Sequence, residues 1–139
     1  MTLEILIGDD IFRRPEYEEI IQKNYILPVQ KKTGQQFNTT YRGTLKDMIA
    51  AAQEKKYDLI ITDLDYDERD SEKRGKEGLY VIEVLHAAGC GAPIVLCTGS
   101  DSFTLEQALP QQQPTTLITG TREKIKYEVL VDFLVKKYS

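Results

Sequence analysis

The sequence is poor in residues on which several classes of protein depend. Its 139 residues include two cysteines, Cys90 and Cys97, one histidine, His86, and no tryptophan. Two cysteines cannot form a disulfide framework, and no CxxC pair or Cys/His cluster indicates zinc. Cys97 lies in an apolar run, where a buried thiol behaves as a small hydrophobe. His86 has no Ser or Cys partner in the pattern, so we interpret it as an ordinary helix residue.

Long apolar runs and an excess of basic charge are also missing. No apolar stretch is long enough to span a bilayer, and the N-terminus lacks the basic region and apolar core of a signal peptide. We therefore expect a cytoplasmic protein without membrane association. The 18 Lys and Arg against 22 Asp and Glu give a net charge of −4, which argues against direct binding to nucleic acid.

The length and composition fit a single domain over residues 1–139. Hydrophobic residues make up 41% of the chain and charged residues 29%, which are ordinary values for a globular domain. A domain of this size can bury a core without metal or disulfides. Because the chain ends at Ser139 directly after its last predicted helix, we expect no output domain, unless the sequence is a fragment of a longer protein.

Short apolar runs alternate with helical patterns along the chain. Continuous runs rich in Ile, Leu, Val and Thr are typical of strands buried on both faces of a parallel sheet. The predicted strands are Leu3–Ile7, Leu59–Thr62, Ile94–Thr98 and Thr116–Thr119, with Phe37–Arg42 as a weaker edge strand. Apolar residues at helical spacing lie within Tyr17–Tyr25, Leu45–Ala52, Leu79–His86, Thr104–Leu109 and Ile125–Phe133. Five alternations predict an α/β fold with a doubly wound, five-stranded parallel sheet and flanking helices.

One segment, Asp65–Glu77, has an unusual composition. It holds six acidic and four basic residues, one aromatic residue and no aliphatic residue. Such a segment cannot bury itself, so we expect a long, solvated loop between the third strand and the third helix.

Acidic and hydroxyl side chains follow the predicted strands. Asp9 and Asp10 follow the first strand, Asp63 the third, and Thr98 with Gly99 end the fourth. In an open parallel sheet the carboxyl ends of the strands form the functional edge. Clustered carboxylates there suit a hard divalent ion such as Mg²⁺. Taken singly, each residue could instead be a helix cap or a turn residue.

This combination resembles the receiver domain of two-component response regulators. The resemblance is carried by three stretches in matching order and spacing along nearly the whole chain: Ile5–Asp10, Tyr57–Leu64 and Ala92–Gly99. It implies a flavodoxin-like sheet with strand order 2-1-3-4-5. It also implies a phosphoprotein of a phosphorelay, acting in signal transduction rather than as an enzyme.

The resemblance assigns roles to individual residues. Asp63 corresponds to the phosphoacceptor, and Asp9 and Asp10 to the Mg²⁺-binding acids, with Asp10 favoured as the direct ligand. The remaining assignments are the backbone carbonyl of Asp65 as a further metal ligand, Thr98 as the hydroxyl that engages the phosphoryl group, and Gly99 and Ser100 as part of the phosphoryl pocket.

The chain also departs from the receiver pattern. The Lys-Pro that usually follows the fifth strand is absent from Leu117–Arg122, and so is the aromatic switch residue of that strand. Arg122 or Lys124 could reach back toward the site, although solvated positions are the simpler expectation for both. The Met-Pro usual after the phosphoacceptor is replaced by Asp65-Tyr66 and the charged segment.

Three functions remain open at this point. The first is a receiver phosphorylated on Asp63 by a histidine kinase or phosphotransfer protein, which signals to an unknown downstream protein and has a last helix that could form a homodimer. The second is a degenerate receiver that binds a partner without phosphorylation. The third is a phosphatase of the haloacid-dehalogenase type, with Asp63 as nucleophile and Asp65 as general acid/base. The opposite order of its motifs and the lack of room for a substrate cap argue against the third.

Overall fold

The computed structural model describes residues 2–68, 77–99, 115–121 and 123–139. The helix predicted over Thr104–Leu109 lies outside these residues. Within the described ranges, no helix is both long enough and apolar enough to cross a membrane.

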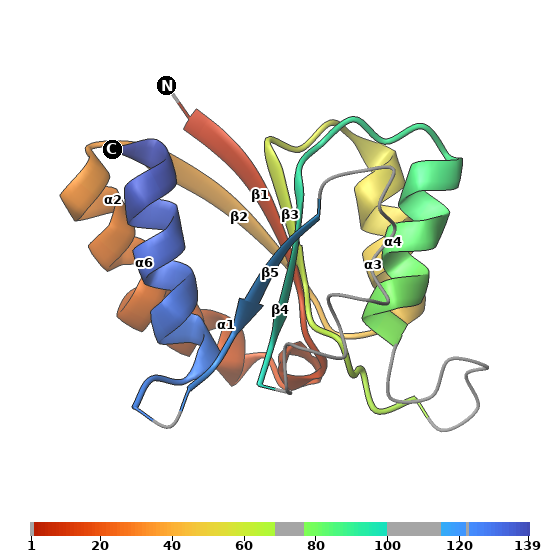
Figure 1. Cartoon of the computed structure of the whole chain (residues 1–139), viewed down its shortest axis with the longest axis horizontal. Helices are drawn as coiled ribbons and strands as arrows, with labels where there is room; N and C mark the ends of the chain where they lie inside the picture. Colours follow the sequence, from red (N-terminus) through yellow and green to blue (C-terminus); the bar gives the residue numbers. More distant parts are fainter. Residues whose placement is uncertain (1, 69–76, 100–114, 122) are drawn as a thin grey trace.

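The strands form one parallel sheet that lies at the centre of the molecule (Figure 1). Its order, β2-β1-β3-β4-β5, is the predicted one, and every neighbouring pair is parallel. The edge position expected for the second strand is confirmed. The strands are β1 (Thr2–Gly8), β2 (Gln36–Arg42), β3 (Leu59–Thr62), β4 (Ile94–Thr98) and β5 (Thr115–Thr119).

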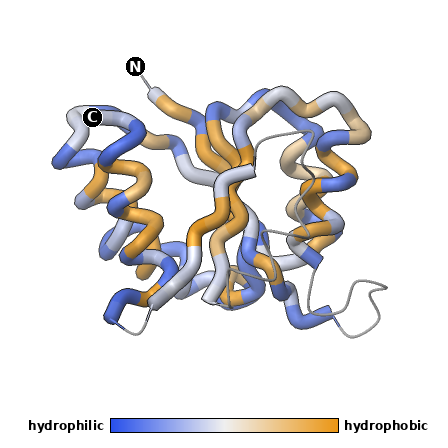
Figure 2. The backbone as a smooth tube through the Cα atoms, in the orientation of Figure 1, coloured by the Kyte–Doolittle hydropathy of each residue, from blue (hydrophilic) through white to orange (hydrophobic). Residues whose placement is uncertain are grey.

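Both faces of the central strands are buried, which explains their uninterrupted apolar runs. Successive residues of a strand point to opposite faces. In β1, Ile5 and Ile7 join the core on one face and Leu6 the core on the other. The same alternation separates Ile61 from Ile60 in β3. Figure 2 shows the apolar stretches turned toward the sheet and the hydrophilic ones outward.

The helices cover the sheet in two layers. One face is covered by α1, α2 and α6, and the other by α3 and α4 (Figure 1). Thr44 caps the N-terminus of α3, because its hydroxyl accepts a hydrogen bond from the amide of Asp47 at 3.1 Å. The helices are α1 (Glu16–Ile21), α2 (Leu27–Thr33), α3 (Leu45–Glu54), α4 (Glu77–Ala87) and α6 (Lys126–Tyr138).

The first helical stretch runs farther than the predicted end at Tyr25. A π turn, Gln22–Ile26, joins α1 to α2, and the stretch ends at Gly34, whose φ of 71° is left-handed. Pro28 has no amide to bond back along this continuous helical stretch. The wider π turn directly before it, in which the amide of Leu27 donates to the carbonyl of Gln22, accommodates the proline without ending the helix.

The last helix begins one residue later than its apolar pattern suggests. Ile125 is an extended N-cap and 54% exposed, so its predicted place in the buried stripe is wrong. Tyr127, only 6% exposed, takes that place in the core beside Leu130. Tyr127 is therefore not available on the outside of the helix for dimerisation.

The prediction that Asp65–Glu77 is wholly solvated is also wrong at its two ends. The side chains of Tyr66 and Glu77 are fully buried. The Tyr66 hydroxyl lies 2.6 Å from that of Thr62, and the Glu77 carboxylate accepts hydrogen bonds from the amides of Tyr66 and Glu68 at 3.3 and 3.2 Å. The composition did not predict the burial of these two side chains, because polar groups can be buried when the fold supplies their hydrogen-bond partners.

Candidate functional site

The predicted acidic residues meet at the carboxyl edge of the sheet. Asp9 and Asp10 follow β1, and Asp63 follows the neighbouring β3. Backbone hydrogen bonds fix the positions of Asp9 and Asp63. The amide of Asp63 donates to the carbonyl of Gly8 at 2.8 Å, and the amide of Asp9 donates to the carbonyl of Arg42 at 3.0 Å. One carboxylate oxygen from each acid lies within 4.8 Å of the others.

The donor chemistry of this cluster fits a magnesium ion. All three side chains offer carboxylate oxygens, the ligands that hard divalent cations prefer. Asp9 is 1% and Asp63 7% exposed, and Asp10 is half-buried. Three carboxylates so close together and shielded from water repel one another unless a positive charge is present. Asp65 has its side chain in solvent and accepts the amide of Asp67 at 2.8 Å.

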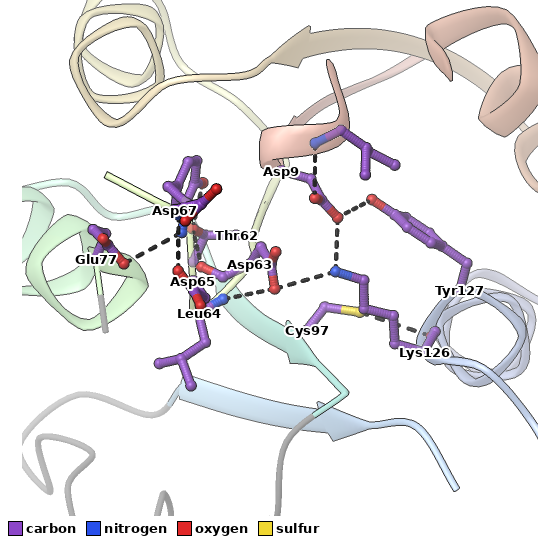
Figure 3. A network of polar contacts seen from close by, with 12 residues as sticks. Asp9, Thr62, Asp63, Leu64, Asp65, Asp67, Glu77, Cys97, Lys126 and Tyr127 are labelled. Atoms are coloured by element: carbon purple, nitrogen blue, oxygen red, sulfur yellow. Dashed lines mark hydrogen bonds and ion pairs between the residues drawn. The ribbon is translucent and has the colours of Figure 1, made fainter. Parts of the chain in front are cut away.

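A lysine that the sequence analysis did not single out reaches this cluster. The ammonium of Lys126, in the first turn of α6, lies 2.7 Å from Asp9 Oδ2 and 3.1 Å from Asp63 Oδ1 (Figure 3). The side chain of Lys126 is 20% exposed. A cation is therefore present beside Asp9 and Asp63, although it comes from the start of α6 and not from the end of β5.

Of the two cations considered in its place, Lys124 does not fill this position. Lys124 pairs with Asp132 at 2.7 Å on the surface, where their side chains are 51% and 61% exposed. Arg122 lies outside the described residues. The position of Lys126 in the first turn of the last helix is the feature that could have identified it. That position becomes exact only when the first residue of the helix is known.

Asp9 has further partners. Its Oδ1 accepts the amide of Ile11 at 3.2 Å, so the capping role considered for the acid pair also holds. Its Oδ2 accepts the hydroxyl of Tyr127 at 2.7 Å in addition to the ammonium of Lys126 (Figure 3). Two consecutive residues of α6 thus bond to one carboxylate oxygen.

The environment separates the pKa values of the three acids. Burial, followed by the charge of Asp9, raises the pKa of Asp63 to about 7. Burial and the hydrogen bond with Asp9 raise the pKa of Asp10 to about 6. Burial also disfavours ionised Asp9, but Lys126 and the hydrogen bonds to the carboxylate outweigh it and lower the pKa of Asp9. Asp9 is therefore the carboxylate most strongly held in its ionised form, whereas burial and the repulsion from Asp9 favour the protonated forms of Asp10 and Asp63.

An open pocket of about 690 Å³ leads from solvent to Asp63. Thr98, Gly99 and Lys126 line it together with the acid. Thr98 is 3% exposed at the end of β4, and a Cβ on Gly99 would have no neighbouring atom within 4 Å. Ser100, predicted to belong to the same pocket, lies outside the described residues.

The segment after Asp63 is held in place from several sides. Glu77 binds it from α4 as described above. Arg13 donates to the carbonyl of Tyr66 at 2.6 Å, and the Glu68 carboxylate accepts the amide of Leu45 at 2.9 Å. The segment that follows Asp63 is therefore anchored to the turn after β1, to the start of α3 and to the start of α4.

The chain was compared with known families and structures. No protein-family model matches it, and no curated protein matches its sequence. Among solved structures it is similar to the chemotaxis response regulator CheY4 of Vibrio cholerae, with a TM-score of 0.63, 17% identity and 98% of each chain covered. It is also similar to the receiver domain of the Francisella response regulator 1452, with a TM-score of 0.60, 15% identity and 99% of each chain covered.

A third similar structure is the CheY-like receiver domain protein of Methanospirillum hungatei, with a TM-score of 0.57, 14% identity and coverage of 99% of this chain and 94% of that one. These similarities show that the chain has the CheY-like, flavodoxin-like fold of receiver domains, as the motifs predicted.

Proposed function

We propose that this chain is a phosphoacceptor receiver domain, phosphorylated on Asp63 in a magnesium-dependent reaction. The observation that carries the proposal is the position of the Lys126 ammonium between Asp9 and Asp63, beside an all-oxygen acid cluster on the receiver fold. Lys126 supplies the positive charge of the lysine that is missing after β5. That missing lysine was the strongest argument against phosphorylation.

Each side chain of the pocket has its own role in the proposed reaction. An oxygen of the Asp63 carboxylate attacks the phosphorus of the donor, the acyl phosphate bond forms, and the bond from phosphorus to the donor breaks. Lys126 lines the same pocket and neutralises charge that develops on the phosphoryl oxygens. Thr98 would supply a hydroxyl to the same group, with Gly99 leaving room for it, and Ser100 is proposed as a further residue of the phosphoryl pocket.

Asp9, Asp10, Asp63 and the carbonyl of Asp65 are the groups proposed to hold magnesium. When bound, the ion supplies positive charge that offsets the acids and the incoming phosphoryl group. Asp10 is the favoured side-chain ligand, because neither Lys126 nor Tyr127 bonds to it among the described contacts.

The partners follow from the chemistry of the donor. A histidine kinase or phosphotransfer protein in the cytoplasm would deliver its phosphoryl group through the open pocket. The signal would leave through a protein contact near β5 and α6, either with a downstream protein or with a second copy of the chain. No catalytic activity of its own is proposed.

A degenerate receiver is the second candidate. It is favoured by the contacts of Asp9, whose Oδ2 accepts hydrogen bonds from both Lys126 and Tyr127. Such a pocket would stabilise one conformation for binding a partner and need no phosphorylation.

Incubation with Mg²⁺ and acetyl phosphate separates these candidates. We expect mass spectrometry to find one added phosphoryl group in the wild type and none in Asp63→Asn. Asp132→Asn, which changes an exposed carboxylate on α6, should behave like the wild type. A wild type without an adduct would support the degenerate receiver, and turnover of a generic phosphomonoester would support a phosphatase.

A further inference from the structure

Tyr127 links the acid cluster to a helix in a way the proposed phosphorylation does not require. Its hydroxyl donates to Asp9 Oδ2 at 2.7 Å, and its side chain is 6% exposed. The same oxygen accepts the ammonium of Lys126, also at 2.7 Å. Both bonds span more than a hundred residues of sequence, and both end on the first turn of α6.

That first turn depends on these bonds more than the rest of the helix does. Its N-cap, Ile125, provides no side-chain hydrogen bond, and its backbone carbonyl alone receives the amides of Glu128 and Val129, at 3.0 and 3.2 Å. Helix ends without side-chain caps lose stability and fray. The side-chain bonds of Lys126 and Tyr127 to Asp9 therefore help to hold this uncapped turn in place.

Oδ2 of Asp9 has no lone pair left for a divalent cation while both of its donors stay in place. Its Oδ1 accepts the amide of Ile11 at 3.2 Å, and its Oδ2 already accepts two donors. A cation held by the acid cluster repels an ammonium and withdraws electron density from the oxygen that Tyr127 uses. The two sets of partners compete for one oxygen.

We propose that Tyr127 senses occupancy of the acid cluster: its hydroxyl leaves Asp9 when that carboxylate takes part in holding magnesium, and the first turn of α6 loosens as a result. The inference rests on the proposed function and extends it, because it assigns the conformational signal to α6 in a chain whose β5 lacks the aromatic switch.

The change would not stay within α6. The ring of Tyr127 stacks on that of Tyr25, with centroids 5.6 Å apart and planes 29° apart. Tyr25 belongs to the π turn between α1 and α2. A displaced Tyr127 therefore alters the packing of both helical segments on that face of the sheet.

Magnesium titration of the unphosphorylated protein tests the competition. Removal of the hydroxyl in Tyr127→Phe should tighten Mg²⁺ binding about fivefold, as expected when one competing hydrogen bond is lost. Tyr138→Phe, a change of the same kind at the far end of α6, should leave the affinity unchanged. Equal affinities of wild type and Tyr127→Phe would overturn the inference.

Hydrogen exchange on the wild type gives an independent test that needs no variant. Saturating Mg²⁺ should speed exchange of the Glu128 and Val129 amides severalfold, while the amide of Val81 in α4 stays unchanged. Unchanged or slower exchange in the first turn of α6 would contradict the inference.

The two proposals fail in different ways. Magnesium binding that is lost in Asp63→Asn but unaffected in Tyr127→Phe would support the receiver function and contradict the role proposed for Tyr127. A wild type that binds no magnesium at all would remove both the sensor and the magnesium-dependent reaction.

Discussion

Gly78 packs against the carbonyl of Asp63 without room for a side chain. A Cβ on this glycine would overlap the Asp63 carbonyl oxygen and would also meet the Cα of Leu64 at 2.9 Å. The amide of Gly78 donates to the carbonyl of Leu64 at 2.8 Å. The start of α4 is thereby held directly against the backbone of Asp63.

We expect Gly78→Ala to destabilise the fold by about 2 kcal/mol, because the obstructing atoms belong to the backbone and cannot rotate away. Gly91→Ala is the matched control, since a Cβ there meets no atom within 4 Å. Urea denaturation measures both variants. Equal stability of the two would show that α4 can shift away from Asp63 at little cost.

Glu77, the neighbour of Gly78, should be the most sensitive acid of the charged segment. Glu77→Ala leaves the buried amides of Tyr66 and Glu68 without their acceptor, at an expected cost of about 2 kcal/mol. Glu54→Ala, at an exposed helix position, should change stability by less than about 0.5 kcal/mol. The free energy of unfolding from urea titration checks this, and a Glu77→Ala variant as stable as Glu54→Ala would refute the anchoring role.

Lys126 and Lys124 give a paired test of buried and exposed cations. At pH 8 with a chelator present, Lys126→Met leaves Asp9 and Asp63 without their counter-charge and should cost about 2 kcal/mol. Lys124→Met breaks only an exposed pair with Asp132 and should cost less than about 0.5 kcal/mol. Thermal denaturation reports the difference.

The same variants differ in function. Lys126→Met should slow labelling by acetyl phosphate at least about tenfold, because loss of one preorganised charge at the transferring group has effects of that order or larger. Lys124→Met should be labelled at the wild-type rate. Equal rates in both variants would mean that Lys126 serves stability alone.

The stability of the metal-free protein should fall as the pH rises from about 4 to about 7. The pKa of Asp63 is raised from 3.8 to about 7, so the folded state holds a proton that the unfolded state has already lost in this range. The stability that protonated Asp63 contributes is therefore complete below the pKa of the unfolded state, 3.8, and is lost as the pH rises through the pKa of the folded state, about 7. The loss is on the order of 3 kcal/mol.

Urea titrations at several pH values, with a chelator present, measure this slope. Asp63→Asn should remove the larger part of it, because an amide does not titrate, and leave the slope that Asp10 contributes below about pH 6 through its own raised pKa. Burial lowers the pKa of His86, which acts in the opposite direction but equally in both proteins. A wild type and variant with parallel pH profiles would contradict the assignment.

The sheet and most of the acid cluster could be predicted from the sequence. Its short apolar runs predicted four of the five strands, because strands buried on both faces must be apolar throughout. The edge strand β2 was predicted more weakly, and the strand order came from the resemblance to receiver domains. It also placed Asp9, Asp10 and Asp63 at one edge, since the carboxyl ends of neighbouring parallel strands meet there.

Only the tertiary structure decided how that cluster is neutralised and supported. Lys126 and Tyr127 reach Asp9 across 117 and 118 positions of sequence, and whether they do so depends on where α6 begins and how it is rotated against the sheet. Tyr66 and Glu77 become buried because the fold brings their hydrogen-bond partners to them. Local patterns record which residues prefer burial, whereas the pairing of distant polar groups is settled only when the helices pack.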